Sequence, residues 1–216
     1  MPTPPLLKLL KIKIRRMAVE AAFDDLFSYS QFTEVALIER SAAHQAAAIT
    51  SDLFYPDRVT DEEIDRLQDE QRQLQESFPQ ALRVSLLGLA HATFETQLVE
   101  ISRVVALSRE IPFPSKVKTA WSAKTFLEKE CGIDCADEGW ALFKSYQSIR
   151  NAFLHNDGRI DIPLNDGSNV VAAAEKIGAD VNDFRISLNR ECAANFAPLC
   201  RKLCMLVLIR NESSAL

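Results

Sequence analysis

The chain has 216 residues, of which 47% are hydrophobic and 25% are charged, and its formal net charge is −5. These values are those of a soluble globular protein with one good hydrophobic core. No run of about eighteen apolar residues is uninterrupted, so we expect no membrane-spanning helix and no membrane partner.

The amino-terminal part combines a basic segment with a long helical pattern. Residues 1–18 alternate aliphatic and basic side chains and form a basic amino-terminal extension. We expect a strand or helix packed by its leucines, with a membrane-surface helix or an RNA-contacting arm as alternatives. Apolar residues then keep helical spacing from about Val19 to Ala48, which predicts a first long helix, with a break near residues 28–30 left open.

A second helix is predicted to begin at Thr60. Residues 51–59 contain aspartates and a proline and are typical of a loop. Thr60 and Glu63 then form a capping-box pattern with an acidic first turn. The Phe78-Pro79 pair is expected to interrupt this helix.

The remaining pattern predicts a helical core followed by an irregular segment. The most apolar helix extends from Ala81 to Arg109, and a shorter amphipathic helix covers about Ala120 to Glu130. Alternating residues and turn formers then suggest a small β-hairpin near 159–172, or only a loop. An apolar helix from Asn189 to Leu208 closes the chain. We therefore predict an all-α, up-and-down bundle of about five to seven helices in one domain, 1–216.

One helix carries the residues that point to chemistry. An amphipathic pattern begins near Asp137 and ends at Arg150-Asn151-Ala152-Phe153-Leu154-His155, before the turn formers Asn156-Asp157-Gly158. His155 is therefore expected in the last helical turn, where helix-end carbonyls favour a cationic imidazole. Asn151 lies four residues earlier and shares its face. Arg150 is rotated from His155 by about 140° in a regular helix.

The Arg150-Asn151-x-x-x-His155 motif resembles the R-x4-6-H signature of the HEPN superfamily. This resemblance implies a helical, metal-independent endoribonuclease that leaves 2′,3′-cyclic phosphate and 5′-hydroxyl ends. Arg150 would stabilise the phosphorane charge, His155 would transfer a proton, and Asn151 would orient the imidazole or a phosphate. The alternative for both charged residues is structural: a surface arginine and a histidine that caps helix-end carbonyls.

Supporting residues and partners follow from the same hypothesis. Lys144 and Arg159 are candidate substrate-binding residues, and Glu95 is a candidate for orienting Arg150 across a helix interface. One histidine does not readily serve both sides of a phosphorus atom, so the chemistry predicts a homodimer with a composite active site. RNA is the expected partner, with an antitoxin or regulatory protein as a further one.

The cysteine content and the charge distribution bear on the cellular location, on metal binding and on the class of function. Five cysteines and no secretory signal favour reduced thiols and a cytoplasmic location. The two C-x3-C pairs are better explained as core filling and a connector, so no metal and no cofactor are expected. Residues 21–100 carry fifteen acidic and five basic side chains, whereas residues 101–216 carry fourteen and fifteen. The half with the motif is thus near neutral. Two functions are therefore considered: a toxin or defence ribonuclease, and a non-catalytic HEPN-type module that binds RNA or protein.

Overall fold

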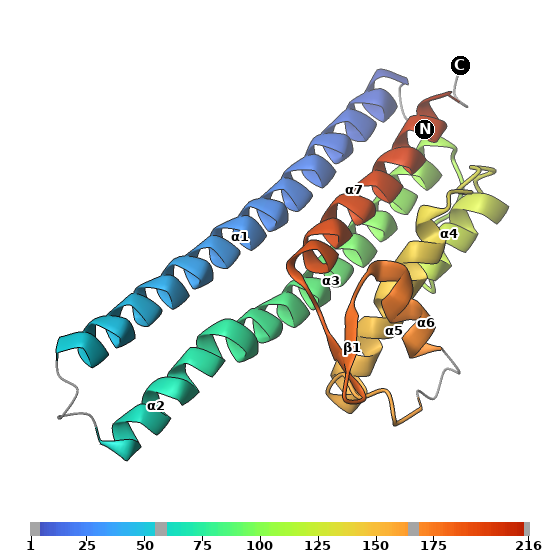
Figure 1. Cartoon of the computed structure of the whole chain (residues 1–216). Coiled ribbons are helices and arrows are strands. Elements are labelled where there is room, and N and C mark those ends of the chain that lie inside the picture. The colour runs from blue at the N-terminus through green and yellow to red at the C-terminus, as the bar shows by residue number, and fades with distance from the viewer. Residues whose placement is uncertain (1–4, 55–59, 164–168, 214–216) are drawn as a thin grey trace.

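The computed structural model describes residues 5–54, 60–163 and 169–213 and is mostly helical (Figure 1). Its elements, in chain order, are α1 (Pro5–Phe54), α2 (Asp61–Arg72), the π-helical turn η1 (Gln73–Ser77), α3 (Phe78–Ser108), α4 (Ala120–Lys129), α5 (Gly139–Asn156), α6 (Val170–Ile177), β1 (Asp180–Asn182), β2 (Arg185–Ser187) and α7 (Arg190–Ser213). The all-α bundle with a small hairpin that the sequence predicts is confirmed.

Helix α1 is one continuous helix, longer than predicted. The described part of the basic segment, residues 5–18, is its first third, and no break occurs at residues 28–30. The reason is that Ile12, Val19, Phe23 and Ser30 repeat at helical spacing on one buried face. The predicted loop at 51–59 is helical as far as Phe54, and residues 55–59 lie outside the described part of the chain.

Helices α2 and α3 follow one another without the predicted interruption. The hydroxyl of Thr60 accepts a hydrogen bond from the Glu63 N–H (3.3 Å), as the capping pattern predicts. Pro79 lacks an N–H and disfavours regular helix before it, and the chain accommodates it through the wider turn η1.

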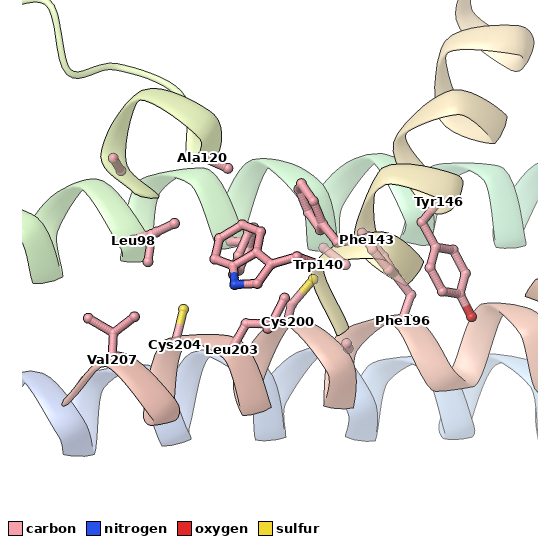
Figure 2. Packing of buried hydrophobic residues seen from close by; sticks show 14 of the residues in the cluster. Leu98, Ala120, Trp140, Phe143, Tyr146, Phe196, Cys200, Leu203, Cys204 and Val207 are labelled. Carbon is pink, nitrogen blue, oxygen red and sulfur yellow. The ribbon is translucent and has the colours of Figure 1, made fainter. Parts of the chain in front are cut away.

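The core lies where α3, α5 and α7 meet, with α1 packed on one side and α4 and α6 on the other (Figure 1). Trp140, Phe143 and Tyr146 of α5 point towards Phe196 and Cys200 of α7 (Figure 2). The Tyr146 hydroxyl donates to the Cys192 carbonyl at 2.9 Å inside this core. These contacts fix the orientation of α5, the helix that carries the motif.

The hairpin lies later in the chain than predicted. β1 and β2 pair in antiparallel register, with Val181 opposite Ile186. The predicted second arm, from Val170, is instead helix α6, because the Asn169 side chain accepts the Ala172 N–H (3.1 Å) and caps it. The predicted first arm pairs with β2 through one bridge, Arg159 to Arg185, and the intervening turn at 164–168 is outside the described residues.

Helix α7 is the one described segment that is long and apolar enough to cross a membrane, because an 18-residue window within Arg190–Glu212 has a mean hydropathy of 1.6. Length and composition alone do not distinguish such a segment from a core helix. Phe196, Leu203, Val207 and Leu208 are fully or almost fully buried inside the bundle. These residues face α1, α3 and α5, on which α7 packs.

Candidate functional site

Helix α5 holds the motif in regular helical geometry up to its end. The helix extends to Asn156, and Asp157 (φ 51°) and Gly158 (φ 73°) then turn the chain in the left-handed conformation. The Gly158 N–H donates to the Ala152 carbonyl at 3.0 Å and closes the helix end. His155 therefore lies in the last turn, as predicted.

One face of α5 presents three of the predicted site residues together. Lys144, Asn151 and His155 are spaced by seven and four residues, which places them in one line along the helix. Lys144 and His155 are exposed and Asn151 is half-buried. We call this line the motif face.

Arg150 lies on a different side of α5. Because the helix stays regular, the rotation of about 140° between Arg150 and His155 is preserved. The Arg150 Nη1 donates to the Asn151 Oδ1 at 3.1 Å, and Arg150 Nε is buried without a hydrogen-bond partner among the described residues. The structure thus brings Arg150 to Asn151, and Asn151 stands between Arg150 and His155.

A buried histidine of α3 lies behind Arg150. His91 is 1% exposed, and its ring stacks on Phe143 of α5 with ring centroids 5.3 Å apart. Burial lowers the pKa of His91; Glu95 opposes this shift and the positive charge of Arg150 adds to it. No sequence pattern links His91 with the motif, because only the packing of α3 on α5 brings the two together.

Glu95 makes its contacts at the start of α4 and with this histidine. Its Oε1 accepts the Ala120 N–H at 3.2 Å, and its Oε2 lies 3.6 Å from His91 Nδ1. A carboxylate at a helix amino terminus is favourably placed, because the first N–H groups there lack helical partners. The side-chain hydrogen bond of Arg150 is with Asn151, whereas Glu95 lies beside His91, whose ring stacks on Phe143 of α5.

Arg159 is less suited to phosphate than Lys144. Its guanidinium binds both carboxylate oxygens of Asp161, at 3.0 and 2.5 Å, and this pairing raises the pKa of Arg159. Its charge is therefore largely compensated on the surface. Lys144 makes no ion pair with any described residue and is the available cation of the motif face.

A hollow of about 820 Å³ adjoins the carboxyl end of α5 and is lined in part by Phe153 and Asp157. Three of its polar side chains bind within the protein. Gln80 bonds to the backbone after β2, Arg83 holds the buried Glu34 at 2.6 and 2.9 Å, and Arg185 pairs with Asp157 at 3.0 Å. These contacts position the hairpin against α3 and α5.

The five cysteines are buried and free. Burial raises the pKa of the Cys135 and Cys192 thiols to about 12 and that of Cys200 well above its ordinary value. Such thiols are poor nucleophiles and poor metal ligands at neutral pH. Within the described ranges no three His, Cys, Asp or Glu side chains gather as a metal site would require.

Comparisons with known protein families, with curated proteins and with solved structures find nothing that matches this chain. Any function assigned to it must therefore be argued from the residues of the site.

Proposed function

We propose that this chain is a metal-independent endoribonuclease that cleaves RNA on the motif face of α5. The observation that carries the proposal is the exposed His155 imidazole in the last turn of α5, aligned with Asn151 and Lys144. The resemblance of the Arg150–His155 motif to HEPN ribonucleases supports the same activity. RNA would be cut to a 2′,3′-cyclic phosphate and a 5′-hydroxyl.

The bond changes define what each residue must do. A base takes the proton of the 2′-hydroxyl, the 2′-oxygen attacks phosphorus, and the 5′-oxygen leaves with a proton from an acid. His155 is the proposed proton-transfer group, because its imidazole is exposed on the motif face and imidazole can both accept and donate a proton. Lys144 is three helical turns away along the same face, about 16 Å, and is placed to bind a phosphate about two or three nucleotides from the one that is cleaved.

Asn151 is the proposed link between Arg150 and the substrate. When its Oδ1 accepts from Arg150 Nη1, its amide N–H2 group remains free to donate to a phosphate oxygen. Arg150 then acts from behind Asn151: it fixes the orientation of the amide and adds positive charge where the phosphorane forms. This role differs from the direct phosphate contact that the motif alone suggests.

The second proton-transfer group is proposed to come from a second copy of the chain. His91 is buried and His44 binds Glu70 of α2 at 3.0 Å, so neither is on the motif face. Two motif faces related by a two-fold axis would supply two His155 imidazoles to one phosphate. The proposed active form is thus a homodimer with a composite site, in the cytoplasm, as a toxin or defence effector controlled by an antitoxin or regulatory protein.

A non-catalytic RNA- or protein-binding module is the second candidate. It is favoured by the inward position of Arg150, whose Nε is buried, and by the net charge of −5. Such a module would use the motif face for contact without cleavage.

Substitution of Asn151 separates the two candidates. Asn151→Asp keeps an acceptor for Arg150 but removes the amide donor, so we expect cleavage to fall at least tenfold with folding intact. Asn195→Asp, at an exposed position of α7, is the matched control and should retain activity. The readouts are cleavage of total RNA in EDTA and identification of the product ends. Cleavage by Asn151→Asp at the wild-type rate would contradict the role of Asn151, and cleavage by no form of the protein would favour the binding module.

A further inference from the structure

The tip of the β1–β2 hairpin carries an aromatic residue in an unfavourable backbone conformation. Asn182 pairs with Arg185, so the turn between the strands consists of Asp183 and Phe184 alone. Both turn residues have positive φ, 47° and 60°, which is the geometry of a type I′ turn, and such turns favour Asn-Gly or Asp-Gly. Asp183 fits this preference, whereas a bulky phenylalanine is an outlier at positive φ.

The packing of the protein gives no reason for a phenylalanine at this position. Phe184 is 68% exposed and is not among the partly buried apolar residues that pack against the core. Its ring stacks on no other aromatic ring within the described ranges. A glycine would form the same turn with less strain, because it adopts positive φ without a steric penalty. Strained residues of this kind cluster at functional sites.

The structure fixes the strained ring at the carboxyl end of the motif helix. The Phe184 carbonyl accepts the Ile160 N–H at 2.9 Å, and the Gly158 carbonyl accepts the Ile186 N–H at 2.9 Å. The hairpin tip is therefore bonded to the segment that directly follows α5 (Figure 1). Ile160 is five residues after His155, and five residues span at most about 18 Å. An RNA strand with one phosphate at His155 thus has a base within reach of Phe184.

We propose that Phe184 is a base-stacking residue, on which one base of a single-stranded RNA lies while the strand is bound at the motif face. The identity of the ligand rests on the proposed function. Aromatic side chains of proteins that bind single strands stack on bases of any sequence, because every base has a π-face. The two backbone hydrogen bonds hold the tip in place, so little ordering of the turn is needed on binding.

The charges around the tip favour a base over a phosphate as the group that is bound there. Arg185 is paired with Asp157 and Arg159 with Asp161, so neither arginine is a free phosphate ligand. The Asp183 carboxylate is exposed and makes no ion pair or side-chain hydrogen bond with a described residue. A carboxylate repels phosphate but accepts a hydrogen bond from the amino group of a base. Asp183 should therefore favour cytosine over uracil at the stacked position.

The first test measures binding of a fluorescently labelled 2′-O-methyl oligonucleotide, which is not cleaved because its 2′-oxygens are blocked. Phe184→Gly should weaken binding about tenfold, as expected for the loss of one stacked base, and Phe184→Tyr should retain it. Phe184→Gly creates the preferred Asp-Gly turn, so it should unfold at no lower temperature than wild type. Phe32→Ala on α1, where the phenylalanine is 74% exposed, is the matched control and should bind as wild type does.

The second test reports the contact and the base preference directly. Phe184→Trp should bind as tightly as wild type, and the fluorescence that it adds should be quenched by the oligonucleotide, because a base stacks on the indole. Wild type should bind oligocytidylate more tightly than oligouridylate. Asp183→Asn keeps a side chain that tolerates positive φ and should remove this difference. Equal binding of the two oligomers by wild type would refute the role of Asp183.

The outcomes distinguish this inference from the proposed cleavage. Unchanged oligonucleotide binding by Phe184→Gly would overturn the inference, even if wild type cleaves RNA. Weaker binding by Phe184→Gly, together with no cleavage by wild type, would support the stacking role and refute the cleavage. Failure of wild type to bind any oligonucleotide would overturn the inference and would favour a protein partner for the exposed ring.

Discussion

Gly158 closes the motif helix, and its replacement by alanine is predicted to destabilise the protein through two separate effects. Its φ of 73° lies in the left-handed region, where a residue with a Cβ is disfavoured by about 1–2 kcal/mol. A Cβ at Gly158 would also lie 2.5 Å from Cε1 and 2.9 Å from Cδ1 of the Phe153 ring. Such overpacking costs about 1–3 kcal/mol, so we expect a total loss of roughly 2–5 kcal/mol.

Gly178 provides the matched control, because its φ is also 73° but a Cβ there would meet nothing within 4 Å. Gly178→Ala should therefore lose only the backbone part, about 1–2 kcal/mol. Equilibrium urea unfolding followed by circular dichroism measures both losses, and each kcal/mol should lower Tm by about 2–4 °C for a chain of this size.

A third variant isolates the clash. With Phe153→Ala already present, Gly158→Ala should cost about as little as Gly178→Ala, because the ring that it meets is gone. Equal losses for Gly158→Ala and Gly178→Ala in the wild-type background would refute the reasoning, since the contact with Phe153 would then carry no energy.

Three further predictions concern the buried groups. Burial lowers the pKa of His91 below its ordinary value of 6.5, so below that pH the unfolded chain binds more protons than the folded chain. The folded state should therefore lose stability as the pH falls. In urea unfolding, His91→Phe should reduce this loss between pH 7 and pH 5. Arg83→Met leaves the buried Glu34 carboxylate unpaired and should lower the free energy of unfolding by about 3–5 kcal/mol. Arg201→Met breaks an exposed ion pair and should lower it by less than about 1 kcal/mol. Equal losses for the two variants would contradict the assigned difference in burial. The five cysteines should not react with a thiol reagent at pH 8 in the native protein and should all react in urea, because their thiols are buried.

Much of the helical architecture is readable from periodicity and capping. The starts of α2 and α4 follow from Thr60 and from the amphipathic pattern after Ala120, and the end of α5 follows from the turn formers after His155. These signals depend on residues close in sequence, so they hold regardless of how distant segments pack.

The errors arise where distant contacts decide the structure. A helix packed by its leucines is one of the predictions for residues 1–18, and residues 5–18 are helical, but Leu6, Leu9 and Leu10 are exposed and Ile12 is the residue buried against the bundle. Val170 is β-branched, which favours a strand, but the Asn169 cap and the packing of α6 on α5 make this segment helical. The sequence predicts a helix break at Phe78-Pro79, but the π-helical turn η1 accommodates Pro79 and the chain stays helical.

The candidate site was also predictable only where local helical spacing determines it. Helical spacing alone places Asn151 and His155 on one face and Arg150 on another, and the structure has this arrangement. The position of His91 behind Arg150, and the contacts of Glu95 with Ala120 and His91, depend on how α3 packs on α4 and α5. No local pattern in the sequence encodes that packing.

The central proposal is that His155 transfers a proton during RNA cleavage, and the most direct test compares His155→Ala with His44→Ala. Both substitutions remove a histidine from a helix, but His44 lies on α1 against α2, away from the motif face. With total RNA and a tRNA pool in EDTA, we predict that wild type and His44→Ala cut at similar rates, that His155→Ala does not cut, and that the products carry 2′,3′-cyclic phosphates. Cleavage by His155→Ala at the wild-type rate, or no cleavage by wild type, would contradict the proposed function.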